Sequence, residues 1–117
     1  MEIISRQEVD IKSFSKEEIL DQRELFLLAK QAVLFVDFCE TEDLAIIGIE
    51  GGTYDGSFTP NIDLIRDYSQ YQLMDDWCEF RSHCNRQARI FLAAYSHDES
   101  FRFYLTIFSK FDWISYR

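Results

Sequence analysis

The sequence predicts a small α+β domain in which two long helices pack on one face of a mostly antiparallel sheet. Apolar residues recur at threes and fours over residues 15–41 and 69–91, which is typical of amphipathic helices. Apolar runs with the length and composition of strands occupy residues 44–50 and 101–108. Strands grouped between helices in this order favour an antiparallel sheet with helices against it. The 117 residues, 47% of them apolar, form one domain, 1–117, which needs no disulfide or metal to fold.

The first helix is expected to begin at Ser15 and to run to about Thr41. Ser15 and Glu18 have the spacing of a capping box, and Phe14 can pack on Ile19 as a hydrophobic staple. The apolar stripe that follows consists of Ile19, Leu25, Leu28, Ala29, Ala32, Val33, Val36 and Cys39. Five more apolar residues widen it, namely Phe26, Leu27, Leu34, Phe35 and Phe38. We therefore expect the second half of this helix to be buried on two sides.

The strands are predicted with different clarity. Residues 44–50 form a continuous apolar run, as expected of a central strand, and Asp55-Gly56 is a hairpin turn signal. Residues 60–65 fit either a short strand or one helical turn. Residues 101–108 alternate most regularly and are the clearest strand, whose edge could also pair with a partner strand.

The second helix repeats the same start signals. Ser69 and Gln72 form a capping box, and Tyr68 and Leu73 a possible staple. The stripe that follows consists of Leu73, Trp77, Phe80, Cys84, Ala88 and Phe91. Acids come first and bases last along this helix, in the order Asp75, Asp76, Glu79, Arg81, Arg86 and Arg89. This order suits the helix dipole and explains part of the charge pattern structurally.

The two ends of the chain are less defined. Residues 1–12 either add a short strand or lie on the surface. Residues 110–117 form an aromatic tail or one more strand.

Negative charge is concentrated in residues 31–80, which hold eleven acids and one base, Arg66. The rest of the chain holds ten acids and eleven bases, so this middle segment accounts for the whole net charge of −9. Such a field repels nucleic acid and anionic membranes and attracts basic proteins or cations. It also favours solubility, which is the simpler explanation. The one cluster of bases, Arg81, Arg86 and Arg89, is expected to pair with nearby acids rather than with nucleic acid.

Cysteine content and the lack of export signals predict a cytoplasmic location. Cys39, Cys78 and Cys84 are an odd number without regular spacing, so no disulfide framework is expected. The N-terminal residues lack the basic and apolar regions of a signal peptide. The longest apolar stretch, residues 25–38, is too short and too polar to span a bilayer.

Catalytic and metal-binding signals are weak. Cys78, His83 and Cys84 could suggest a zinc site or a Cys-His nucleophile, but adjacent helical residues point to different faces. His97 is expected to be a solvated loop residue. Four middle carboxylates could converge on a divalent cation without any recognisable spacing: Glu50, Asp55, Asp63 and Asp67. Asp67 also fits a second role, in support of the Ser69 cap. We therefore predict no catalytic residue, no metal, no cofactor and no enzymatic activity.

Protein binding is the better-supported role. Tyr and Trp side chains near carboxylates are typical interface anchors, although each also fits a core position. The aromatic residues of interest are Tyr54, Tyr68, Tyr71, Trp113 and Tyr116. From charge and expected exposure, the predicted partner-binding residues are Glu50, Tyr54, Asp55, Asp63, Tyr71, Asp75, Asp76 and Glu79.

A family resemblance agrees with this role. A long helix is followed by two blocks, Ala45-Ile46-Ile47-Gly48-Ile49-Glu50-Gly51 and Pro60-Asn61-Ile62-Asp63-Leu64-Ile65-Arg66-Asp67-Tyr68-Ser69. The segment from Phe14 to Ser69 thereby resembles bacterial immunity proteins of contact-dependent growth inhibition and polymorphic-toxin systems. The resemblance implies a cytoplasmic protein that neutralises one cognate toxin, the C-terminal domain of a large secreted or surface protein. Such toxins are often nucleases with basic clefts, which an acidic surface would suit.

Two other functions stay open. The chain could be an acidic interaction or adaptor module that binds several partners weakly. It could also be a small metal-dependent enzyme that uses the middle carboxylates, in which case magnesium, calcium or manganese would raise its melting temperature.

Overall fold

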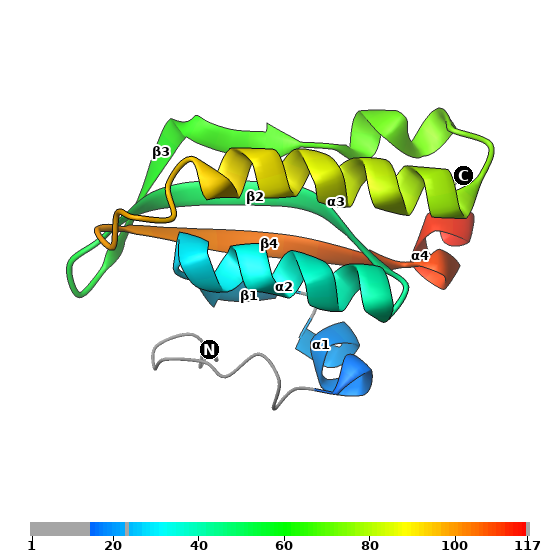
Figure 1. Ribbon diagram of the computed structural model, residues 1–117, viewed down its shortest axis with the longest axis horizontal. Coiled ribbons are helices and arrows are strands. Elements are labelled where there is room, and N and C mark those ends of the chain that lie inside the picture. Colours follow the sequence, from blue (N-terminus) through cyan, green and yellow to red (C-terminus); the bar gives the residue numbers. More distant parts are fainter. Residues whose placement is uncertain (1–14, 23, 117) are drawn as a thin grey trace.

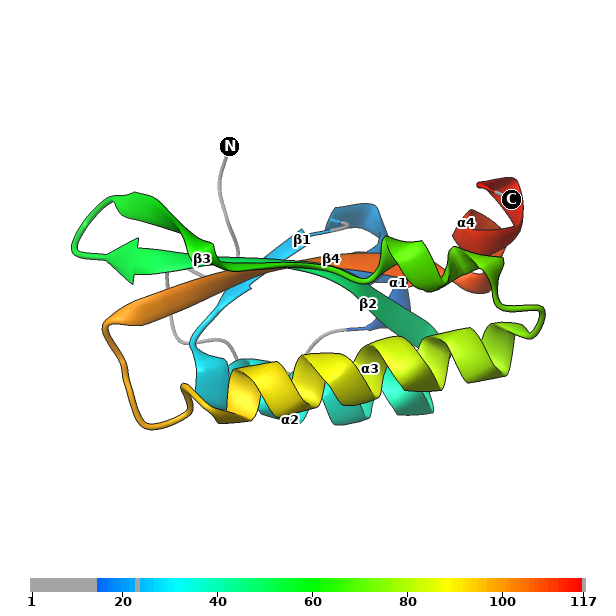
Figure 2. The ribbon, with the colours of Figure 1, turned by 90° about the horizontal axis from the view of Figure 1, so that it is seen from above.

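The computed structural model describes residues 15–22 and 24–116, with a two-layer arrangement (Figure 1). The elements in chain order are α1 (Lys16–Gln22), β1 (Glu24–Leu27), α2 (Ala29–Thr41), β2 (Leu44–Tyr54), β3 (Phe58–Asp67), the 3-10 helix η3 (Ser69–Leu73), α3 (Trp77–Ala93), β4 (Phe101–Ser109) and α4 (Lys110–Ser115). The four described strands form one antiparallel sheet in the order β1-β4-β2-β3. The two long helices, α2 and α3, lie side by side on one face of it (Figures 1 and 2). The predicted α+β class is confirmed.

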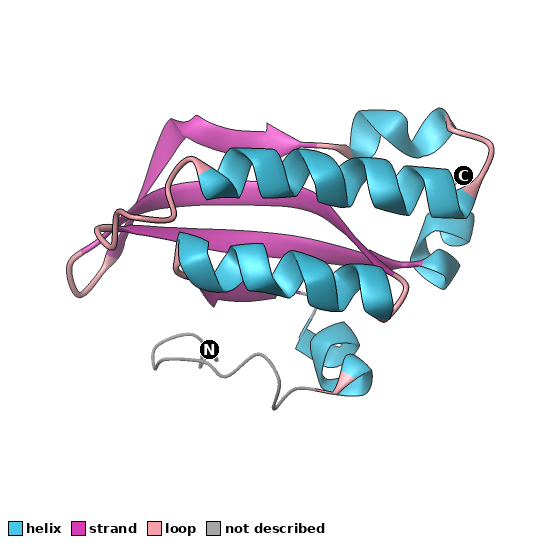
Figure 3. Cartoon of the chain, viewed as in Figure 1, coloured by secondary structure: helices cyan, strands magenta, loops and turns pink. Residues whose placement is uncertain are grey.

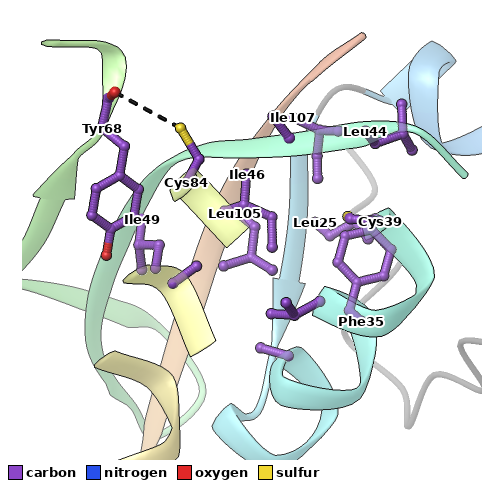
Figure 4. Close-up of a cluster of buried hydrophobic side chains, with 14 of the residues drawn as sticks. Leu25, Phe35, Cys39, Leu44, Ile46, Ile49, Tyr68, Cys84, Leu105 and Ile107 are labelled. Atoms are coloured by element: carbon purple, nitrogen blue, oxygen red, sulfur yellow. Dashed lines mark hydrogen bonds between the residues drawn. The ribbon is translucent and has the colours of Figure 1, made fainter. Parts of the chain in front are cut away.

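The core lies between that sheet face and the two long helices (Figure 4). Phe35 of α2 and Phe80 of α3 are fully buried, as are Ile46 of β2 and Leu105 of β4. Cys39 and Cys84 are buried among them, as the helical spacing predicted, whereas Cys78 is exposed, and all three are free thiols. No helix among the described residues is both long enough and apolar enough to cross a membrane.

The single helix predicted from Ser15 to Thr41 is wrong, because a strand interrupts it. The Ser15–Glu18 capping box is present, with the Glu18 N–H donating to Ser15 Oγ at 3.2 Å. The helix it starts nevertheless ends at Gln22, and β1 then pairs with β4. Three consecutive apolar residues, Leu25 to Leu27, bury both faces of a strand as readily as one side of a helix, and the pairing decides between them. The Phe14 staple and residues 1–12 lie outside the described residues.

The expectation that the second half of this helix is buried on two sides is also wrong. Leu34 is 64% exposed and Asp37 is exposed as well. One stripe of α2 is buried, consisting of Ala29, Ala32, Phe35, Val36 and Cys39. The amphipathic spacing was therefore a better guide than the number of apolar residues.

The second long helix begins at Trp77 rather than at Ser69. Residues 69–73 form η3. Asp76 is the N-cap of α3, and its carboxylate accepts a hydrogen bond from the Glu79 N–H at 3.0 Å. Ser69 instead donates its N–H and its hydroxyl to Asp67, at 2.9 and 2.6 Å. Asp67 therefore binds Ser69, but the N-cap of η3 is Tyr68, so there is no Ser69 cap for Asp67 to support. The side chains of Gln72 and Leu73, and with them the second predicted box and staple, lie outside the described residues.

The strand predictions hold except at the C-terminal end (Figure 3). β2 is an interior strand, and its hairpin to β3 turns at Asp55-Gly56, where Gly56 has a positive φ of 106°. Residues 60–65 belong to strand β3. β4 lies between β1 and β2, and its residues Phe103–Thr106 are paired on both sides. Residues 110–115 form helix α4 instead of a strand, because Ser109 and Asp112 make a reciprocal capping box.

Candidate functional site

The eight predicted binding residues fall into two groups, one along the β2–β3 hairpin and one at the end of the molecule opposite the hairpin turn. The hairpin group, on and beside the β2–β3 hairpin, is Glu50, Tyr54, Asp55 and Asp63. The helix-start group, on η3 and the start of α3, is Tyr71, Asp75, Asp76 and Glu79. The molecule measures 41 × 29 × 24 Å, and its long axis separates the hairpin turn from the start of α3 (Figure 1). The sequence therefore does not bring these residues to one site, but to two.

The six carboxylates in the two groups are exposed. Within the described part of the chain, no salt bridge involves any of them. Asp76 caps α3, while the other five make no described side-chain hydrogen bond. The described residues thus leave the negative charge of both groups without an ion pair.

The aromatic residue of the hairpin group packs within the protein, although Ile62 and Ile65 on β3 are exposed. Glu50 lies between Ile49 and Gly51, both buried, so it points to the sheet face opposite the helices. Tyr54 on the same face is half-buried, with its ring 5.5 Å from that of Phe26. It belongs to an aromatic cluster of Phe26, Tyr54, Phe58 and Tyr104. Tyr54 therefore packs within its own chain.

The helix-start group borders an open groove of about 490 Å³. The groove is lined by Met74, Cys78, Glu79, Ser82, His83 and Arg86. Tyr71 is half-buried, with its ring 4.2 Å from that of His83. Asp75, Asp76 and Glu79 lie at the N-terminus of α3, where the helix dipole stabilises negative charge. These acids can therefore remain unpaired at low cost to the fold.

Other acids of the middle segment are used inside the structure. Arg81 donates to Asp43 Oδ1 at 2.7 Å and lies 3.4 Å from Glu40, and Trp77 Nε1 donates to Asp43 at 2.6 Å. Burial opposes ionisation of Asp43, but the bonds from Trp77 and Arg81 outweigh it and lower the pKa of this carboxyl. Arg89 pairs with Asp37. The prediction that the arginines pair with nearby acids is confirmed for Arg81 and Arg89.

Asn85 was missed by the sequence reasoning. It is 1% exposed and accepts a hydrogen bond from the Ile46 N–H at 2.9 Å. Its Nδ2 donates to Leu44 O at 2.9 Å and to Glu40 at 2.7 Å, which joins α3 to both β2 and α2. The available signal was its position directly after Cys84, which belongs to the apolar stripe of this helix.

The described residues form neither the carboxylate metal site nor the Cys–His pair that the sequence left open. Glu50, Asp55, Asp63 and Asp67 are spread along the two strands, and residues 15–22 and 24–116 contain no group of three or more His, Cys, Asp or Glu side chains suited to a metal ion. Cys84 Sγ approaches Tyr68 O at 3.9 Å, whereas His83 packs on Tyr71. Burial raises the pKa of Cys84 to about 12, so the thiol is protonated and a poor nucleophile.

The free edge of β3 is capped by its own side chains. Tyr68 donates its N–H to Ile47 O on β2, so alternate residues before it, including Asp63 and Ile65, direct their backbone groups outward. Arg66 Nη1 donates to the carbonyl oxygens of Asp63 and Ile65 at 3.1 and 2.8 Å. Asn61 Oδ1 accepts from the Asp63 N–H at 2.9 Å. These bonds occupy groups that a partner strand would otherwise use.

Exposed apolar side chains gather on α4. Phe111 is 75% exposed, Ile114 55% and Tyr116, just after the helix, 70%. Elsewhere in the described residues the large apolar side chains most exposed are Leu34, Ile62, Ile65 and Ile90. Sequence reasoning named Tyr116 but missed Phe111 and Ile114, because it did not expect a helix there. The Ser109–Asp112 capping box was the available signal.

Comparison with known proteins adds no relative. No protein-family model matches the chain, and no curated protein is significantly similar to it.

Proposed function

We propose that this protein is an immunity protein, which binds and neutralises a cognate toxin domain by protein–protein contact through an acidic surface. The observation that carries the proposal is the set of exposed carboxylates without ion pairs in the two groups. Arg81 and Arg89 pair with three acids of the same segment, whereas the carboxylates of the two groups stay unpaired among the described residues. The resemblance of residues 14–69 to immunity proteins supports the same conclusion.

Electrostatics gives such an inhibitor two advantages. An acidic surface accelerates encounter with a basic cleft, and it selects against partners of the wrong charge. A nuclease that binds phosphates needs a basic cleft, so a nuclease toxin domain is the proposed target. The protein acts by occupying the basic cleft of the toxin and needs no catalytic group or cofactor of its own.

The two resembling blocks supply mainly scaffold and only two of the eight predicted contact residues. Residues 45–51 lie in β2, whose side chains form much of the core, and residues 60–69 form β3 and the turn into η3. Glu50 and Asp63 are the predicted contact residues within them. Specificity for one toxin thus resides mainly in residues outside the two blocks.

A second function is favoured by the separation of the two acidic groups. Two anionic groups could engage two different basic partners, as in an adaptor module. An adaptor would bind several proteins with micromolar affinity, whereas an immunity protein binds one with nanomolar affinity.

The test is a pull-down with the tagged full chain from the native host, at low and at high salt, with mass spectrometric identification. An immunity protein should retain one dominant basic protein, a fragment from the C-terminal end of a large secreted or surface protein. Retention of many weak partners, all lost at high salt, would favour the adaptor. Retention of no basic protein at either salt concentration would contradict both functions.

A further inference from the structure

We infer that the end of the molecule formed by α4 and the start of α3 is the docking surface, and that its occupant is a basic protein face with an apolar pocket. This inference rests on the proposed function and specifies which acidic end makes the contact. Its basis is an exposed apolar helix face next to unpaired carboxylates.

Helix α4 is anchored to the protein by a buried side chain on the side opposite its exposed face. Trp113 of α4 is 6% exposed, and its ring lies 5.9 Å from that of Trp77 and 6.1 Å from that of Phe80. Ser109 and Asp112 cap the helix at its other end. Because Trp113 is buried, Phe111 and Ile114 are presented to solvent on a fixed support. A side chain that is already ordered loses less entropy on binding.

The acids lie beside this support. Trp77 and Phe80, which contact Trp113, belong to the same first turn of α3 as Glu79, and Asp76 caps that turn. Figure 1 shows α4 and the start of α3 at the same end of the molecule. Lys110 is the base that α4 itself contributes, against Asp75, Asp76 and Glu79. An apolar centre with a charged rim is the usual composition of a protein interface.

The other exposed apolar side chains lack this combination. Leu34 and Ile90 lie on the outer sides of α2 and α3, where Arg89 already neutralises Asp37. Ile62 and Ile65 lie on β3 near Asp63 and Glu50, but there the Arg66 guanidinium, bound to the carbonyl oxygens of Asp63 and Ile65, adds positive charge. At the hairpin turn, Tyr54 and Phe58 pack against Phe26. Charge complementarity and apolar exposure therefore coincide at the α4 end.

The test compares two double variants that remove exposed apolar side chains of similar exposure. The first is F111S/I114S on α4, and its matched control is L34S/I90S on α2 and α3. The probe is the basic protein retained by the wild-type chain, purified, with dissociation followed by surface plasmon resonance. We expect F111S/I114S to dissociate about tenfold faster or more, because central apolar anchors dominate interface energies, while the control stays within about twofold.

Three results would overturn the inference. Equal dissociation of F111S/I114S and wild type places the contact elsewhere, as does a larger effect of L34S/I90S, and either leaves the proposed function intact. Absence of any basic partner in the wild-type arm contradicts the proposed function itself, before any variant is compared.

A second measurement does not depend on the native partner. An amphipathic peptide of lysines and leucines is titrated into ¹⁵N-labelled full chain while amide chemical shifts are recorded. Shifts concentrated in residues 75–79 and 110–116 support the surface. Shifts concentrated in residues 50–58, or distributed over the whole surface, contradict it.

Discussion

The rings of Trp77 and Trp113 lie 5.9 Å apart, and this contact fastens α4 to the first turn of α3. Both indoles are almost fully buried, at 4% and 6% exposure. The Trp77–Trp113 contact thereby links the N-terminus of α3, which Asp76 caps, to α4, which exposes Phe111.

Trp113→Ala should therefore weaken both the fold and the docking surface. Loss of a buried aromatic side chain costs about 3–5 kcal/mol, less where the site can collapse. Urea denaturation should show a lower free energy of unfolding, and the pull-down partner should bind more weakly even where the variant is folded. Phe111→Ser is the control, since it should leave the free energy of unfolding within about 0.5 kcal/mol of wild type.

Asn85→Ala should destabilise the protein by about 2–3 kcal/mol, because the buried Ile46 N–H and Leu44 carbonyl lose their partners. Arg86→Ala on the adjacent, exposed position is the matched control and should change stability by less than about 0.5 kcal/mol. Denaturant titrations of the two variants measure the difference. Equal stabilities would show that water replaces the Asn85 amide without cost.

The negative charge of Asp43 should stabilise the fold at neutral pH and should cease to do so at acidic pH. Its folded-state pKa is lowered, so its contribution is present above the unfolded pKa of about 4 and disappears as pH falls through the folded pKa. Asp43→Asn retains the shape and suits the left-handed backbone there, where φ is 62°. At pH 7 the loss should be below about 1 kcal/mol, because the pair is partly exposed.

Thermal unfolding of wild type and Asp43→Asn from pH 7 down to pH 2 tests this sign. The two melting temperatures should converge at the acidic end. A gap that stays constant over the whole range would mean that the charge of Asp43 does not stabilise the fold.

Removal of the β3 caps should cause self-association. In Arg66→Ala with Asn61→Ala, the outward backbone groups of Asp63 and Ile65 become available to a second strand. Sedimentation velocity should show a concentration-dependent dimer or larger species. Arg102→Ala, which removes similar bonds to the carbonyl oxygens of Glu99 and Phe101, should stay monomeric. A monomeric double variant at all concentrations would show that the caps are dispensable.

The sequence predicted the fold class and the interior strands because these depend on local apolar pattern. It predicted helix ends less well, because capping signals compete. Both Ser69 and Asp76 are good caps, and the bond from Ser69 to Asp67 decides in favour of Asp76. The strand at Glu24–Leu27 could not be foreseen, since only pairing with β4 distinguishes Leu25–Leu27 as a strand from the same residues in a helix.

The candidate site was predicted residue by residue but not as a surface. Exposure of Glu79 follows from its place on an amphipathic helix, whereas Asp75 lies in the turn before that helix. Their separation from Asp55 and their closeness to α4 follow from the sheet order, which the sequence does not specify locally. Trp113 was an ambiguous aromatic until its ring was found against Trp77.

The helix-start acids are proposed to steer a basic partner to the α4 end. The most direct test is the association rate of the partner with D75K/E79K, which spares the Asp76 cap, against E50K/D55K at the hairpin. We predict that D75K/E79K slows association by about tenfold at low salt and reduces its salt dependence, while E50K/D55K has a clearly smaller effect. Equal rates for D75K/E79K and wild type, or a larger effect at the hairpin, would contradict the account.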